Sequence, residues 1–95
     1  MGRFEWWSVR ELLKHLTPDH QLELLAAFVS RGIQDGWYFE SVIKAIDSVQ
    51  LPVTRKMPLL TLVREQLYGR PYGSPKNKGQ LIDSLNAVLG DPVVQ

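Results

Sequence analysis

The feature that most constrains the fold of this chain is a pair of apolar stripes, each at helical spacing, on either side of a connection that cannot be helical. The stripes consist of Leu60, Val63 and Leu67 and of Leu81, Leu85 and Val88. These spacings place the apolar side chains on one face of each helix, so the two faces can pack together. Residues 69–75 (GRPYGSP) contain two glycines and two prolines, through which neither helix extends. The pattern predicts helices over 58–68 and 75–89, joined by an extended loop.

Two cap motifs predict where the first helices begin. Ser8 and Glu11 have the S-x-x-E spacing of a capping box, in which each side chain satisfies a free backbone amide of the first turn. Thr17 precedes Pro18, which is a capping hydroxyl followed by a proline at the first helical position. The predicted helices span residues 8–16 and 18–31.

A further helix is predicted over 38–49 from the helical spacing of Phe39, Val42, Ile43, Ile46 and Val49. Pro58 is predicted to open the helix over 58–68, and Gly90 to end the last one. The helix over 18–31 has the widest apolar surface, so we expect it to be the most buried element. No segment has the alternating pattern of a strand. The sequence therefore predicts an all-α bundle of about five short helices, followed by a mobile tail over 91–95.

Length and composition set the class of protein. Ninety-five residues suffice for one domain with a modest core, so a single domain over 1–95 is expected. The absence of cysteine excludes disulfides and thiolate chemistry, and is compatible with a reducing cytoplasm. The sequence contains neither a signal-peptide pattern nor an apolar run of about 18 residues. We therefore expect a soluble cytoplasmic protein without a membrane partner.

Motifs for catalysis or metal binding are missing from the sequence. His15 and His20 are five residues apart across a predicted helix break, which is not the spacing of a histidine metal pair. Asp19 and Glu23 lie one helical turn apart, a spacing explained by the preference of acidic residues for helix N-termini. No serine lies in a G-x-S-x-G motif, and the loop over 69–75 lacks the lysine of a phosphate-binding loop. The sequence therefore predicts no enzyme activity, no metal and no cofactor.

Positive charge is concentrated in the second half of the chain. Residues 1–53 contain five basic and seven acidic side chains, a net charge of −2, whereas residues 54–95 contain six basic and three acidic ones, a net charge of +3. A local basic cluster attracts phosphate backbones even when the whole chain is close to neutral. The alternative is an ordinary solvated face of lysines and arginines.

The end of the chain contains a lysine just ahead of an L-I-acid-x-L helix. These residues are Lys78, Leu81, Ile82, Asp83 and Leu85. Together with the preceding helix and extended loop, they resemble the SAP and Rho-N-terminal-like group of helix–extended-loop–helix modules. The resemblance covers residues 58–90, and it implies nucleic-acid binding through positive groups in the loop and at the start of the last helix. The candidate nucleic-acid-binding residues are Arg64, Arg70, Tyr72, Lys76 and Lys78, with DNA or RNA as the partner.

The aromatic residues support a second hypothesis. Trp6 and Trp7 are adjacent, so both cannot point to the same side of one helix, and at least one is expected to be exposed. Exposed tryptophans are enriched at the centres of protein interfaces. Trp6, Trp7 and Trp37 are therefore candidate partner-binding residues, although packing of Trp6 and Trp37 on the core is the alternative. The two functional hypotheses are a nucleic-acid-binding accessory or regulatory protein, and an adaptor or inhibitor that docks on another protein.

Overall fold

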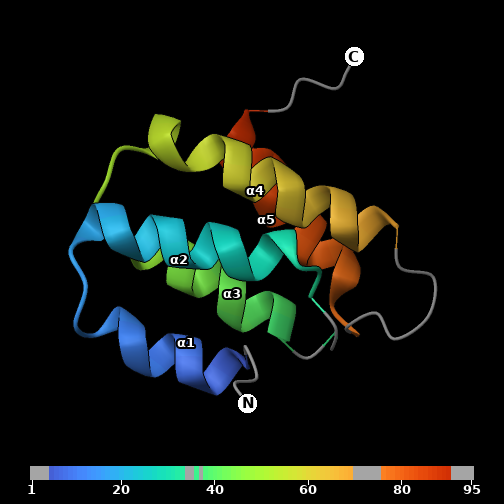
Figure 1. Cartoon of the computed structure of the whole chain (residues 1–95). Coiled ribbons are helices and arrows are strands. Elements are labelled where there is room, and N and C mark those ends of the chain that lie inside the picture. Colours follow the sequence, from blue (N-terminus) through green and yellow to red (C-terminus); the bar gives the residue numbers. More distant parts are fainter. Residues whose placement is uncertain (1–4, 34–35, 37, 70–75, 91–95) are drawn as a thin grey trace.

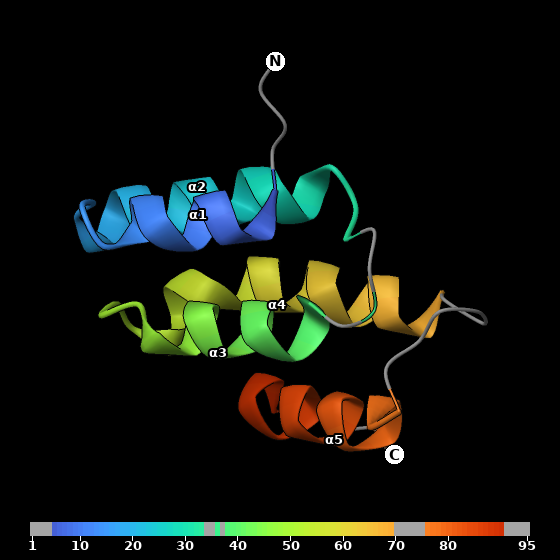
Figure 2. The ribbon, with the colours of Figure 1, turned by 90° about the horizontal axis from the view of Figure 1, so that it is seen from below.

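The computed structural model describes residues 5–33, 36, 38–69 and 76–90, and within these ranges it contains five α-helices and no strand. They are α1 (Trp6–Leu13), α2 (Pro18–Ser30), α3 (Tyr38–Ser48), α4 (Val53–Tyr68) and α5 (Lys78–Leu89). The helices lie in three layers, with α1 beside α2, then α3 beside α4, and α5 on the far side of α4 (Figures 1 and 2). The predicted all-α bundle is confirmed.

One continuous apolar core joins the layers. All five helices contribute to it, and Phe39 is its largest fully buried side chain. The other core residues are Trp6, Val9, Leu25, Phe28, Val29, Ile33, Val42, Ile46, Val49, Leu59, Leu60, Val63, Leu67, Leu81 and Leu85. α4 contains more buried residues than α2 and packs against α2, α3 and α5. The prediction that the helix over 18–31 would be the most buried is therefore wrong, because α4 lies between two layers.

The first helix begins two residues earlier than the capping box predicted. Glu5 is the N-cap residue, and its carbonyl accepts from the amide of Ser8 at 3.1 Å, so Ser8 lies inside the helix. The earlier start brings Trp6 into the core beside Val9, one turn further on. Burial of a tryptophan contributes about 4–6 kcal/mol, whereas a cap contributes about 1 kcal/mol, so burial decides the start. The helix also ends earlier than predicted, at Leu13.

The fourth helix begins at Val53 rather than at Pro58. Pro52 is the N-cap residue with an extended backbone, and its carbonyl accepts from the amide of Arg55 at 2.9 Å. Pro58 lies inside the helix, where its ring nitrogen cannot donate one ladder hydrogen bond. The additional turn places Lys56 under the end of α3, where its ammonium group donates to the carbonyl oxygen of Asp47 at 2.8 Å.

The remaining helix limits follow the sequence signals closely. Thr17 caps α2 by accepting from the amide of His20 at 3.5 Å, and Pro18 is the first residue of the helix. α3 begins at Tyr38, as predicted. α5 begins at Lys78, three residues later than predicted. Ser74 and Pro75, which suggested the earlier start, lie outside the described residues. The tail over 91–95 also lies outside them.

Substitution by alanine of Gly79 in α5 and of Gly90, which follows this helix, should change the stability of the protein in opposite directions. Gly90 ends the helix with φ of 66°, a left-handed conformation that alanine adopts only with strain, while the space around it is open. We expect Gly90→Ala to lower the free energy of unfolding by about 1 kcal/mol. Gly79 lies in the first turn, where an added Cβ would meet no other atom, so Gly79→Ala should raise it by about 0.5 kcal/mol. Urea unfolding followed by circular dichroism measures both, and a stabilising Gly90→Ala would contradict the left-handed backbone conformation.

None of the helices in the described part of the chain combines the length and apolar character needed to cross a membrane.

Candidate functional site

The helix pair α4 and α5 is antiparallel, so the last turn of α4 and the first turn of α5 lie at the same end of the pair (Figures 1 and 2). Leu67 of α4 and Leu81 and Leu85 of α5 are buried between the helices and the rest of the core. On the side of this contact, Arg64 donates a hydrogen bond to the side-chain oxygen of Asn86 at 2.7 Å. The predicted helix–loop–helix arrangement is therefore present in the described residues on both sides of the loop.

The bond between Arg64 and Asn86 joins the two helices. Tyr68 is the last residue of α4 and Lys78 is the first residue of α5, so both lie at the same end of the helix pair. Tyr68 is 59% exposed, Lys76 is exposed, and Lys78 is half-buried. The structure thus gathers two cations and one exposed aromatic ring at one end of the molecule. The predicted site residues Arg70 and Tyr72 lie outside the described residues.

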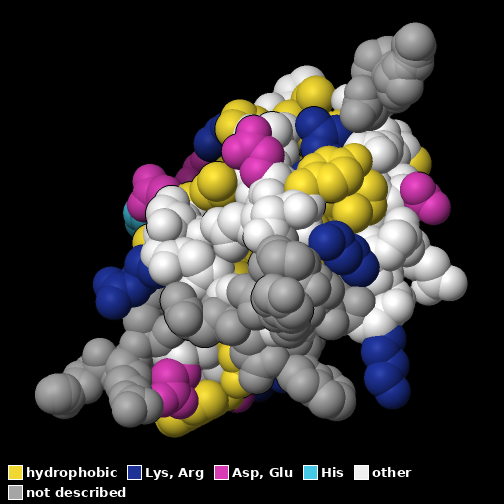
Figure 3. Space-filling model, turned by 90° about the vertical axis from the view of Figure 1, so that its right-hand side faces the viewer, with side chains coloured by type: hydrophobic (Ala, Val, Ile, Leu, Met, Phe, Trp, Pro, Cys, Tyr) yellow, Lys and Arg dark blue, Asp and Glu magenta, His cyan; other side chains and the backbone are white. Residues whose placement is uncertain are grey.

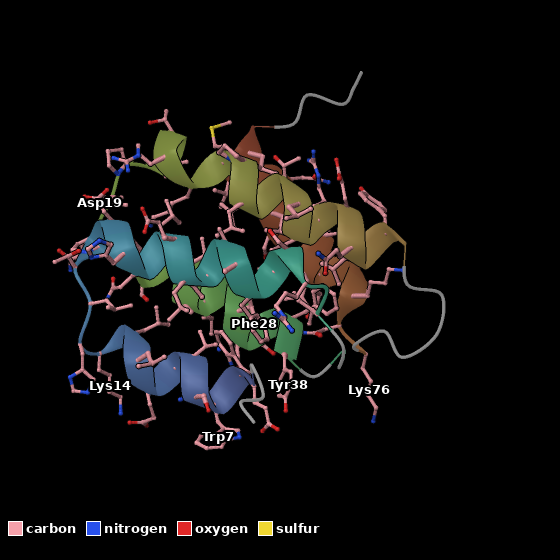
Figure 4. All side chains as sticks on the ribbon, in the orientation of Figure 1. Trp7, Lys14, Asp19, Phe28, Tyr38 and Lys76 are labelled. Carbon is pink, nitrogen blue, oxygen red and sulfur yellow. The ribbon has the colours of Figure 1, made fainter. Side chains whose placement is uncertain are left out.

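This end of the molecule has a mixed surface. Figure 3 shows Lys and Arg side chains directly above and below a hydrophobic patch, with acidic side chains scattered around the margins. Figure 4 shows the side chain of Lys76 extending away from the fold. Asn77 donates to Glu40 of α3 at 3.5 Å, and Glu40 also pairs with Lys44 at 3.4 Å. The start of α5 therefore has a carboxylate beside it, which is itself partly neutralised by a lysine.

The structure separates the remaining basic residues of the second half. Lys56 is only 5% exposed, and its ammonium group donates to the carbonyl oxygen of Asp47 at 2.8 Å. Arg55 pairs with Asp19 of α2 at 2.7 Å, on the opposite end of α4. The half-buried Arg64 is held against Asn86. The positive segment is therefore not one continuous surface, and only Lys76 and Lys78 of the described cations lie at the start of α5.

The adjacent tryptophans have opposite environments. Trp6 is 4% exposed, and its ring centroid lies 5.2 Å from that of Phe28. Trp6 is therefore a core residue, and its assignment to a partner-binding surface is corrected. Trp7 is 64% exposed and points away from the bundle, with its indole Nε1 donating to the carboxylate of Glu5 at 2.6 Å (Figure 4). The expectation of one exposed tryptophan is confirmed, while Trp37 lies outside the described residues.

Sequence reasoning missed the side chains that join helix ends to one another. Gln66 of α4 donates to the carbonyl oxygen of Val29 at 2.7 Å and accepts from the amide of Ile33 at 2.9 Å, which joins it to the end of α2. Gln21 of α2 donates to the carbonyl oxygen of Leu13, at the end of α1, at 2.8 Å. Lys56 does the same for α3. Carbonyls at helix ends have no partner within their own helix, and these side chains bond to them from a neighbouring helix, in addition to the backbone bonds that Val29 and Leu13 accept from Gly32 and Leu16. The sequence alone does not indicate which glutamine bonds to the end of a neighbouring helix.

Among the described residues, no group of acidic or histidine side chains is arranged to hold a metal ion. His20 lies beside the hydroxyl of Thr17, at 3.2 Å, at the exposed start of α2. No protein-family model, curated protein or solved structure matches this chain.

Proposed function

We propose that this chain is a small non-enzymatic protein that binds nucleic acid through the end of the α4 and α5 pair, in an accessory or regulatory role. The observation that supports the proposal best is the position of Lys76 and Lys78 together at the start of α5, at the end of the helix pair where Tyr68 of α4 is exposed. Lysines at such a position contact phosphate groups without regard to base sequence.

The resemblance to SAP and Rho-N-terminal-like modules agrees with this geometry. Lys78 is the first residue of α5, and Leu81 and Leu85 of the same motif are buried against the core. The motif residues therefore divide into a buried apolar set and a cation at the end of the helix pair. In the proposed function, Lys78 at the end of the helix pair contacts a phosphate backbone, while the leucines hold the helix in place.

We expect the double substitution Lys76→Ala and Lys78→Ala to weaken nucleic-acid binding roughly tenfold at low salt, because two phosphate contacts are lost. The slope of log Kd against log salt concentration should decrease by roughly 1.4–1.8. Fluorescence anisotropy of labelled single-stranded and double-stranded DNA and RNA, at several salt concentrations, measures both quantities.

The matched control is the double substitution Arg10→Ala and Lys14→Ala, which removes one exposed cation from α1 and one from its C-cap position. Its net charge equals that of the first variant. A difference in nucleic-acid affinity between the two variants therefore arises from the position of the cations and not from the total charge. Equal loss of binding in both variants, or no binding by the unmodified protein at low salt, would refute the proposed site.

A second candidate function is docking on another protein through Trp7. Trp7 is the most exposed large apolar side chain among the described residues, and its indole Nε1 donates a hydrogen bond to the carboxylate of Glu5. Tryptophan has only two side-chain torsions and a large apolar surface, which suits it to anchor an interface. In this function the chain acts as an adaptor or inhibitor.

A further inference from the structure

We infer that Tyr68 is a stacking platform for an unpaired base, so that this chain binds single-stranded nucleic acid in preference to duplex. The inference rests on the proposed function and specifies its substrate class. It starts from an exposed aromatic ring that the fold does not use: Tyr68 is 59% exposed, whereas the neighbouring Leu67 is fully buried. Tyr38, by contrast, packs partly buried against the core.

The backbone under Tyr68 is held firmly. Leu67 anchors the last turn of α4 in the core, and the amide of Gly69 donates to the carbonyl of Glu65 at 3.0 Å, which closes that turn. A tyrosine has only two side-chain torsions, so a ring on a fixed helix end is ordered at small entropic cost when a base stacks on it. Base-to-aromatic stacking depends little on base identity because every base has a π-face.

The position of Tyr68 relative to the cations matches the needs of a single strand. Arg64 lies one turn back on the same face of α4, where Asn86 holds its guanidinium group at 2.7 Å. Tyr68 ends α4 and Lys78 begins α5, so both lie at the same end of the helix pair. In this inference a base stacks on Tyr68 and the cations at the same end of the helix pair contact the phosphates of the strand, which is the combination of stacking surface and positive groups found in single-strand sites.

The charges at this end favour a single strand over a duplex. Lys56 is buried and Arg55 pairs with Asp19 at the other end of α4, while Glu40 lies beside Asn77. The described cations at the start of α5 are Lys76 and Lys78, a pair rather than the row that would follow the phosphates of a duplex, and the faces of paired bases are hidden from Tyr68. Stacking adds binding free energy only for an unpaired base.

The test compares Tyr68→Ala with Tyr68→Phe on fluorescein-labelled oligo(dT), oligo(U) and a DNA duplex of equal length, about 12 nucleotides, a length that covers a typical single-strand site. We expect Tyr68→Ala to weaken binding of both single strands roughly fivefold or more, Tyr68→Phe to bind like the unmodified protein, and duplex binding to be unchanged by either. Leu12→Ala, which shortens a 50% exposed apolar side chain on α1, is the control with no expected effect. The two single strands distinguish DNA from RNA.

The outcomes separate this inference from the function on which it rests. Binding that is lost in the Lys76 and Lys78 variant but unchanged in Tyr68→Ala overturns the stacking role and leaves the proposed function standing. Equal weakening of single-strand and duplex binding by Tyr68→Ala overturns the preference for unpaired bases. Absence of binding to all three probes at low salt overturns both.

Discussion

Trp6→Ala is expected to lower the free energy of unfolding by about 3–5 kcal/mol, whereas Trp7→Ala should change it by less than about 1 kcal/mol. The difference arises from burial, since Trp6 is 4% exposed and packs on Phe28, while Trp7 is 64% exposed. Small domains have a total stability of about 5–15 kcal/mol, so the loss at Trp6 removes a large part of it. Urea unfolding followed by far-UV circular dichroism, with both variants in the same buffer, measures the two values.

Trp6→Phe is the informative control for this pair. The indole Nε1 of Trp6 is buried without a hydrogen-bond partner among the described residues, and phenylalanine keeps an aromatic ring against Phe28 while removing that polar atom. We expect Trp6→Phe to be much less destabilising than Trp6→Ala. Similar losses for alanine at both positions would contradict the burial difference on which the separation of core and surface rests.

The same variants test the docking hypothesis. Trp7→Ala should keep its helical circular dichroism while losing the complex with any protein that docks on this residue. Loss of helical signal in Trp7→Ala would instead assign that residue to the core. Trp6→Ala is unsuitable for that test because its folding defect would abolish every interaction of the domain.

The sequence predicted the helices well where local signals agree with burial. Thr17 and Pro18 define the start of α2, and Gly90 ends α5 in the left-handed conformation that glycine adopts readily. Local signals misled at two helix starts. The capping box at Ser8 has a smaller free energy than burial of Trp6, and α4 begins before Pro58, which brings Lys56 under the end of α3.

The candidate site was predictable in part, because a sequence shows the number of charges but not the position of each charged group. Lys56 and Lys76 look alike in a count of basic residues, yet one is buried under α3 and the other is exposed beside α5. Arg64 was predicted as a phosphate-binding residue, and the structure shows it bonded to Asn86, a contact between helices that periodicity cannot reveal. Lys76 and Lys78 are close together in the sequence, so their proximity required no tertiary information.

Gln66→Leu is expected to lower the free energy of unfolding by about 1–3 kcal/mol, because it removes two hydrogen bonds while keeping a side chain of similar size. Those bonds, to the carbonyl of Val29 and the amide of Ile33, join α4 to the end of α2. The substitution should lower the stability of the whole domain, and it should also loosen the end of α2 in particular. Hydrogen exchange at the amide of Ile33 should therefore accelerate more than exchange in α5.

The neighbouring position provides the control for Gln66. Glu65→Gln alters an exposed side chain on the same turn and should change stability by less than about 0.5 kcal/mol. Gln66→Glu keeps an oxygen to accept from the amide of Ile33 but places a second oxygen against the carbonyl of Val29, so it should be destabilising even though its shape is conserved. If Gln66→Glu were as stable as the unmodified protein, the donated bond to Val29 would contribute nothing. The contact between α2 and α4 would then rest on apolar packing, the bond from the amide of Ile33 and the exposed pair of Arg55 and Asp19.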